Sequence, residues 1–353
     1  MAIITTVAPE SLDRQWSLSS GTRTDSSSST STSSLPSSKV EEPTTTNDAT
    51  TKQDVSSYIL SQLSTREIEI AARAASYEYL IASSSNIILF EETKKYAKQY
   101  IERYLNSKKS SKKPMNVDDV LQKITSTLQF RQEMHVEKLI TCTTKDDECY
   151  YANRLEKQLS SKHMFVQGYD KDGRSTFIFR PKYVQHNNHD KEWTIKEAVY
   201  TMERAIASTK SPDQTINAIV DMNGFNPIKH SPPFEIGKEF MLTLRNHYAG
   251  YIHKIYIINP PASFTWIWNM FQTFVGSNTR SKINFIHTTK KHGIEQQLES
   301  SYDHDEIPSW LLESSLSLSS SSSRQKSDGG IENDIDIQRY LYELPFDRTY
   351  DGQ

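Results

Sequence analysis

The amino-acid sequence has few cysteines, few glycines and no strong excess of either charge. Only two of its 353 residues are cysteines, which makes a disulfide framework implausible and a reducing compartment the default expectation. The net charge of −3 at pH 7 argues against a general nucleic-acid-binding protein. No apolar run reaches the length of about 20 residues that a transmembrane helix needs, and the first residues lack the pattern of a secretory signal. We therefore expect a cytoplasmic monomer without nucleic acid as a partner.

Glycine patterns that bind nucleotides are missing as well. None of the 11 glycines forms a G-x-G pair, and Gly237-Lys238 is followed by Glu239, not by the serine or threonine of a phosphate-binding loop. The G-x-S-x-G turn of α/β-hydrolases is also missing. These absences argue against an enzyme, and we expect neither a cofactor nor a bound metal.

Two small groups of potential metal ligands have simpler interpretations. His186, His189 and Asp190 lie close together in "VQHNNHDKEW", but a polar loop after a strand explains them better than a metal site, which would need further ligands. Cys142 and Cys149 have no second pair of cysteines beside them, so we interpret both as ordinary thiols.

Two tracts rich in serine and threonine divide the chain. Residues 22–51 and 314–330 cannot bury enough apolar surface to offset the loss of chain entropy, so both are predicted to be disordered. The residues between them are enough for a sizeable core. The predicted parts are a disordered tail (1–54), a helical domain (55–160), a sheet domain (161–313), a disordered linker (314–330) and a C-terminal segment (331–353).

The period of the apolar residues changes near residue 161. Intervals of three and four predict helices before it, over residues 55–82, 87–106, 116–134, 135–141 and 148–160. After it, two β-type runs flank Asp172-Gly173, which predicts a tight hairpin because glycine accepts a positive φ. Residues 215–287 then alternate strand, helix, strand, helix and strand. Apolar strands separated by helices pair in parallel, so the sequence predicts an α/β fold.

Two further segments have informative patterns. The helix predicted over residues 192–208 has one apolar face, formed by Ile195, Ala198, Val199, Met202 and Ile206. The C-terminal segment carries apolar residues, among them Ile331, Ile335, Leu341 and Leu344, so we expect it to pack back onto the folded domain.

The stretch "PPASFTWIWNMFQTFVG", residues 260–276, reads as a helix that is apolar nearly all the way round. One face of its helical wheel carries Phe264, Ile267, Trp268, Phe271, Phe274 and Val275, whereas Trp266 and Met270 point elsewhere. Periodicity leaves two interpretations open. The helix is either sandwiched in the core, or it covers an apolar cavity with one face and contacts a membrane with the other.

Three segments of the second half resemble the CRAL-TRIO family of lipid-binding and lipid-transfer proteins. "VQGYDKDGRSTFIF" is similar to the family's hairpin, and "IVDMNGF" to a strand that ends in Asp before a Gly. "HYAGYIHKIYIINPPASFTWIWNMFQTFVGSNTRSKINFIH" resembles the longest block of the family, which contains an aromatic helix and the pattern T-x-x-K-I. Upstream, "NVDDVLQKITSTLQFRQEM" is similar to the family's helical N-terminal module. Order and spacing together make the resemblance specific over roughly residues 90–310.

The resemblance implies a helical N-terminal domain followed by a mostly parallel sheet, flanked by helices that enclose a lipid cavity. It implies binding of one amphipathic lipid, a phospholipid first, and its exchange or presentation at membranes by a peripheral protein. The alternative is a scaffold domain of the same fold that transfers no lipid. The implied residues are Phe225, Phe264, Ile267, Trp268, Phe271, Phe274 and Val275 for the cavity and its gate, Trp266 and Met270 for membrane contact, and Thr279 and Lys282 for the headgroup.

The sequence departs from the family at two positions. Ser175 stands where the hairpin has a proline, a mild change. Gly250 falls at the place of a glutamate that helps to hold the inositol headgroup in phosphatidylinositol binders. Lys282 of T-x-x-K-I is retained, so only half of the headgroup set is present, and the identity of the lipid stays open.

Overall fold

The computed structural model describes eight stretches of the chain, all of which belong to one compact unit. They are residues 49–85, 90–107, 116–142, 150–184, 190–248, 250–288, 293–312 and 335–351. Most of the two serine-rich tracts, together with His186 and His189, lies outside these residues.

The described residues of the N-terminal part form five helices. They are α1 (Ala49–Gln62), α2 (Thr65–Ala75), α3 (Tyr77–Ser85), α4 (Phe90–Ser107) and α5 (Val117–Glu133). The single helix predicted over residues 55–82 is wrong, because the chain breaks it twice. Ser64 and Glu67 form a reciprocal capping box that starts α2, and Ser76 has an extended backbone between α2 and α3. α1 begins at Ala49, inside the tract that was expected to be disordered.

Two hydrophobic clusters form the interior. The first lies among α1, α2, α4 and α5, with Ile59, Ile101, Ile124 and Leu128 fully buried at its centre. The second surrounds the sheet. Helices α6 (Val136–Thr141) and α7 (Tyr150–Leu159) contribute Leu139 and Leu155 to this second cluster, although both helices precede residue 161.

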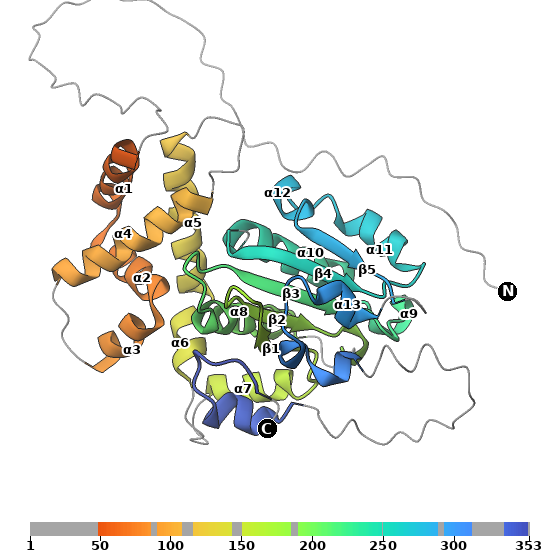
Figure 1. The fold of residues 1–353 in the computed structure, drawn as a ribbon. Coiled ribbons are helices and arrows are strands. Elements are labelled where there is room, and N and C mark those ends of the chain that lie inside the picture. Colours follow the sequence, from red (N-terminus) through yellow and green to blue (C-terminus); the bar gives the residue numbers. More distant parts are fainter. Residues whose placement is uncertain are drawn as a thin grey trace, which may run out of the picture. The chain divides into compact units, whose positions relative to one another are not determined.

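The sheet has five strands in the order of the sequence, side by side in Figure 1. They are β1 (Met164–Tyr169), β2 (Ser175–Phe179), β3 (Ile216–Asp221), β4 (Ile252–Ile258) and β5 (Ile283–Ile286). β1 and β2 form the antiparallel hairpin, and the other neighbours pair in parallel. Gly173 has the positive φ of 78° that the turn requires. The predicted α/β fold, with its mostly parallel sheet, is confirmed.

Helices and short turns connect the strands. α8 (Lys191–Ser208) follows the hairpin, and α9 (Pro227–His230) and α10 (Phe234–Thr243) follow β3. One π-helical turn, η3 (Leu244–Tyr248), continues α10 toward β4. α11 (Phe264–Phe271) and α12 (Ser277–Arg280) lie between β4 and β5, and α13 (Ile294–Leu298) comes after β5. The aromatic stretch therefore forms a helix of eight residues, shorter than residues 260–276.

The described C-terminal residues, 335–351, pack against α8 and the outer edge of β1. Arg204 of α8 donates hydrogen bonds to the carbonyl oxygens of Tyr340 at 2.7 Å and Pro345 at 3.0 Å. The amide of Tyr350 donates to the carbonyl of Val166 at 2.8 Å, which extends the sheet beyond β1. The segment is thus part of the core around the sheet.

The connection between α6 and α7 holds a disulfide-bonded cysteine. This cysteine is Cys142, and because it is disulfide-bonded, its interpretation as an ordinary thiol is wrong. Its sulfur accepts a hydrogen bond from the amide of Ala152 at 3.2 Å, in the first turn of α7. The two helices pack against each other, a proximity that spacing in the sequence does not reveal. Cys149 lies outside the described residues.

Candidate functional site

An apolar cavity of about 310 Å³ lies between the sheet and the helices that follow its strands. Side chains from the middle of the sheet form its floor: Phe177, Phe179, Ala218, Val220, Ile255 and Ile257. Residues of α8, α10 and α11 form its walls. The strands supply this floor because successive side chains alternate between the two faces of a sheet, so every second residue of each strand points to the same side.

α11 lines the cavity with one face only. Phe264, Ile267, Trp268 and Phe271 line it. Within α11, all of which the structure describes, no residue is fully buried, and the side chain of Trp266 is 66% exposed. The interpretation of α11 as a helix sandwiched in the core is therefore wrong.

Of the other residues named in the sequence analysis for the cavity and the membrane contact, some line the cavity and some do not. Phe225 and Val275 line it. Phe274 is absent from the lining and packs instead against Phe234 and Phe271, at ring-centroid distances of 6.2 and 6.4 Å. Met270 is half-buried and also lies outside the lining.

The two residues implied for the headgroup have different environments. Thr279 lines the cavity, whereas Lys282 does not. The Nζ of Lys282 donates a hydrogen bond to the carbonyl oxygen of Ile252, and burial lowers the pKa of this lysine. The structure brings Thr279, but not the charge of Lys282, to the cavity wall.

α10 and α11 approach each other closely at Gly237. A Cβ atom added to this buried glycine would lie 2.7 Å from Cζ of Phe271 and 3.1 Å from its Cε1. Only a residue without a side chain lets the ring sit against the backbone of α10. The close packing of α11 against α10 thus depends on one glycine.

Two polar residues of the cavity wall were missed by the sequence analysis. Glu197 of α8 is fully buried, and neither of its carboxyl oxygens has a hydrogen-bond partner among the described residues. Its Oε2 lies 3.5 Å from Nε2 of His163, which also lines the cavity. Burial raises the pKa of Glu197 well above its usual value. Burial, assisted by the charge of Arg180, lowers the pKa of His163 to about 3. Burial thus disfavours the charged form of both side chains.

The sequence around this cavity matches a known family. Residues 159–311 match the family described as CRAL/TRIO domain. The chain contains a CRAL/TRIO domain. The resemblance indicated by the sequence motifs is thereby confirmed over these residues, which include strands β1 to β5 and helices α8 to α13. The similarity of the upstream helices to the family's N-terminal module stays a prediction.

Three curated proteins are similar in sequence to parts of this chain. "Phosphatidylinositol transfer protein CSR1" of Eremothecium gossypii is 26% identical over 137 residues, which cover 38% of this chain and 30% of that protein. "Patellin-6" of Arabidopsis thaliana is 24% identical over 178 residues, 47% of this chain and 40% of that protein. "Phosphatidylinositol transfer protein SFH5" of Candida glabrata is 34% identical over 56 residues, 16% of this chain and 19% of that protein. The chain thus spans less than half the length of these relatives.

One solved structure, "Crystal structure of Sfh5", superimposes on 53% of this chain and 66% of its own. Its sequence identity is 16% and the TM-score is 0.41. Both values are too low to carry an argument about function.

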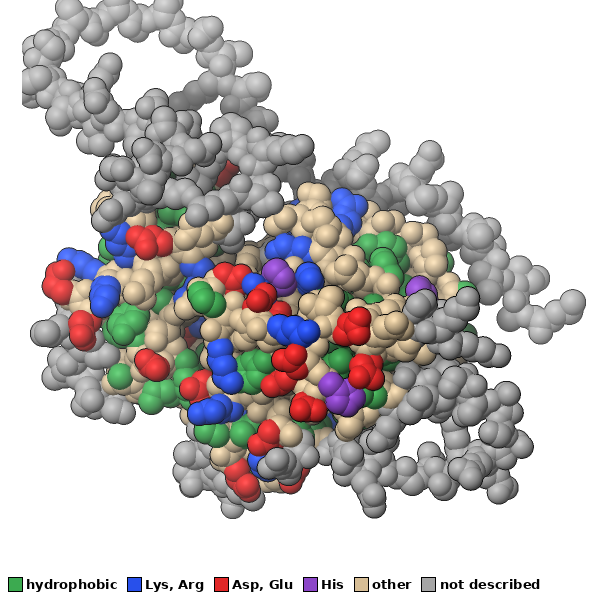
Figure 2. Space-filling view, in the orientation of Figure 1, with side chains coloured by type: hydrophobic (Ala, Val, Ile, Leu, Met, Phe, Trp, Pro, Cys, Tyr) green, Lys and Arg blue, Asp and Glu red, His purple; other side chains and the backbone are tan. Residues whose placement is uncertain are grey.

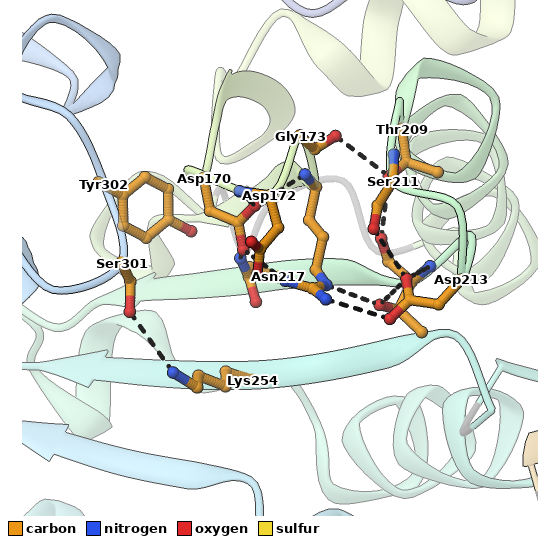
Figure 3. Close-up of polar contacts among 12 residues, drawn as sticks. Asp170, Asp172, Gly173, Thr209, Ser211, Asp213, Asn217, Lys254, Ser301 and Tyr302 are labelled. Atoms are coloured by element: carbon orange, nitrogen blue, oxygen red, sulfur yellow. Dashed lines mark hydrogen bonds and ion pairs between the residues drawn. The ribbon is translucent and has the colours of Figure 1, made fainter.

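The hairpin motif of the CRAL/TRIO domain is explained by a polar cluster at the ends of β1 and β2, seen in Figure 3. Arg174 donates to Asp172 at 2.5 Å, to Asp213 at 3.1 Å and to Asp170 at 3.3 Å. Asp170 also accepts hydrogen bonds from the amide of Arg174 and from the side chain of Asn217. These acids already have partners, so the cluster fixes the turn and is not a candidate ligand site.

The first glycine of the same motif, Gly168, also has a structural reason. It has a φ of 76°, and an added Cβ would lie 2.4 Å from the carbonyl oxygen of Glu306. The backbone of β1 can therefore approach the residues after α13 only at a glycine.

The described residues of the chain show neither a metal site nor a membrane span. No group of three or more histidine, cysteine or acidic residues in them could hold a metal ion. Asp190, the described member of the histidine-rich cluster, caps α8 and pairs with Arg154. Of the helices described, none is long and apolar enough to cross a bilayer.

Proposed function

We propose that the chain binds one amphipathic lipid in this cavity and exchanges or presents it at membranes. The observation that carries the proposal is an apolar cavity whose outer wall, α11, is aromatic and yet not buried. Apolar lining with few polar groups is typical of sites for hydrophobic ligands. Two relatives are named as phosphatidylinositol transfer proteins, which supports a phospholipid as the first candidate.

α11 acts in this proposal as the gate. The cavity volume of about 310 Å³ is at the lower end of the roughly 300–1,000 Å³ of small-molecule sites. Long acyl chains need more room, so α11 moves away from α10 when lipid enters. Phe264, Trp268 and Phe271 then contact the acyl chains, and the ring of Phe271 returns to Gly237 on closure.

The membrane contacts the outer side of the gate. Trp266 is 66% exposed, Phe285 of β5 is 48% exposed and Ile228 of α9 is 92% exposed. Figure 2 shows hydrophobic side chains on the surface over α11 and β5. Exposed apolar side chains beside a cavity mouth suit shallow insertion at a bilayer surface. Met270 on the same helix adds to this contact, which is peripheral and transient.

A phosphate of the lipid would be held by Thr279 and Lys282, at the end of the cavity near α12. Lys282 reaches it only after releasing the carbonyl of Ile252. Gly250 offers no carboxylate for an inositol ring. A preference for phosphatidylinositol over phosphatidylcholine is therefore expected to be weak.

The decisive experiment is to purify the full chain and identify the lipid that copurifies with it by mass spectrometry. A stoichiometric lipid, together with transfer of labelled lipid between vesicles, supports the proposal. A protein that copurifies empty and transfers no lipid contradicts it and favours the alternative, a domain of this fold that serves as a scaffold.

A further inference from the structure

Glu197 and His163 are polar residues for which an acyl chain offers no partner. Both are buried in the wall of the cavity, where α8 faces the start of β1. The distance of 3.5 Å between Oε2 of Glu197 and Nε2 of His163 is too long for a good hydrogen bond between them. A buried polar group without a partner destabilises the fold, so native proteins retain few of them without a functional reason.

The hydrogen-bond partners of His163 determine which of its ring nitrogens carries the proton. The hydroxyl of Ser161 donates to the carbonyl oxygen of Gln158 at 3.0 Å, and its oxygen also contacts Nδ1 of His163. With the Ser161 proton on the carbonyl oxygen of Gln158, Nδ1 is the donor in that contact. The neutral ring then presents Nε2 as an acceptor toward Glu197.

The carboxyl of Glu197 supplies the hydrogen-bond donor of the pair. Burial raises the pKa of Glu197 well above its usual value, which favours the protonated carboxyl and hence an O–H donor. One O–H donor of Glu197 and one acceptor of His163 thus lie side by side, farther apart than a good hydrogen bond. A hydroxyl group is both an acceptor and a donor, so a single hydroxyl satisfies both residues at once.

We propose that Glu197 and His163 form a subsite that binds the uncharged hydroxyl group of a lipid, with its hydrocarbon part directed toward α11. The inference rests on the proposed function, because it assigns the class of lipid bound in the same cavity. It favours a neutral lipid with one hydroxyl over a phospholipid, whose acyl chains would leave the carboxyl of Glu197 without a hydrogen-bond partner.

The surroundings of the pair disfavour an anionic group. Met164, Phe179 and Met202 line the cavity with it. The lysine and arginine of the lining, Lys157 and Arg245, are both exposed. Arg180, a buried cation whose charge acts on His163, lies outside the lining and already donates to the carbonyl oxygen of Lys162. A phosphate at the pair would therefore lose its hydration without a cation from the lining to replace it, which is unfavourable.

The test compares two probes that differ in one proton donor. A fluorescent polyene long-chain alcohol and its methyl ether are titrated into the full-length protein. We expect the alcohol to bind at least about tenfold more tightly, since the ether cannot donate to His163. Equal binding of the two probes overturns the subsite but not the proposed lipid binding. This outcome includes the case in which a bound water alone satisfies the pair. Binding of neither probe, with transfer of phospholipid retained, also overturns it. No binding of any lipid contradicts the proposed function as well.

Variants separate the subsite from a structural role. Glu197→Leu should abolish the preference for the alcohol, whereas Glu197→Gln keeps a donor and should retain most of it. Glu192→Gln changes an exposed carboxyl of the same helix, outside the cavity lining, and should leave the preference as in the wild type. The melting temperature of Glu197→Leu should stay the same or rise, because the unpaired carboxyl is removed. If Glu197→Leu keeps the preference for the alcohol over the ether, the proposal is overturned. If Glu197→Leu does not fold, Glu197→Gln decides, and loss of the preference in that variant overturns the proposal.

Discussion

Replacement of Gly237 by alanine should hold the gate partly open without unfolding the protein. The added methyl group would lie 2.7 Å from the ring of Phe271, so the ring must retreat by several tenths of an ångström or more. Overpacking of this kind typically costs about 1–3 kcal/mol. Alanine also favours the helix α10 over glycine by about 0.8–1.0 kcal/mol. The second effect offsets part of the first in global stability, but only the first acts on the closed position of α11.

The assay is transfer of labelled lipid between vesicles, measured beside a thermal melt. A destabilisation of the closed state by about 1.4 kcal/mol shifts its equilibrium with the open state tenfold, so release of lipid should become about five- to tenfold faster. The melting temperature should change by only a few degrees. Gly276→Ala is the matched control, since a Cβ there has no neighbour within 4 Å. A large fall in melting temperature with an unchanged transfer rate per folded molecule would show that Phe271 is part of a fixed core.

Four further predictions concern the membrane contact, the headgroup, the C-terminal segment and the buried carboxyl. Replacing Trp266 and Met270 together by serine should change the free energy of unfolding by less than about 1 kcal/mol, yet slow vesicle transfer because the apolar membrane anchors are lost. Lys282→Ala should reduce transfer of phospholipids while leaving transfer of a neutral lipid unchanged, and equal losses for both would contradict a phosphate contact. Arg204→Met removes the donor for the carbonyls of the C-terminal segment, and should lower the melting temperature by roughly 5–10 °C; an unchanged melt would show that these bonds do not hold the segment. Because burial raises the pKa of Glu197, the folded chain keeps a proton that the unfolded chain releases above about pH 4.3, so this group makes stability fall as pH rises. Chemical denaturation from pH 4 to 8 should therefore show a larger gain for Glu197→Gln at pH 8 than at pH 4, and a constant difference would mean that the carboxyl is ionised in the fold.

The sheet could be predicted because each of its strands and its hairpin turn is encoded by residues that are close together in the sequence. β3, β4 and β5 are short apolar runs separated by helical patterns, and this alternation allows few arrangements other than parallel pairing. The hairpin needed only Asp172-Gly173, since the turn geometry itself selects glycine. The three helices within residues 55–82 were missed for an equally local reason. Ser64 with Glu67 is a start signal for α2, and the continuous apolar spacing across it concealed that signal.

The cavity could be predicted only in outline. Periodicity identified the face of α11 that lines it, because Phe264, Ile267, Trp268 and Phe271 share one side of the helix. It could not place Phe274, which follows the last residue of α11 and turns toward Phe234. Lys282 was assigned by a motif. Its distance from the cavity depends on the carbonyl of Ile252 in a neighbouring strand, which no motif records.

α8 shows where reasoning from sequence fails and why the failure is informative. Its pattern gives one apolar face and leaves Glu197, Glu203 and Arg204 outside it, yet all three are buried. Glu203 pairs with an arginine of α5 that lies 72 residues away, and Arg204 donates to the carbonyl of a tyrosine 136 residues away. Periodicity has no access to such distant partners. Since two of these buried charges are satisfied by the fold, they have a structural explanation. Of these three, only Glu197 has no hydrogen-bond partner among the described residues. A buried polar group normally has such a partner, so a carboxyl without one in a cavity wall marks a place where a ligand is expected.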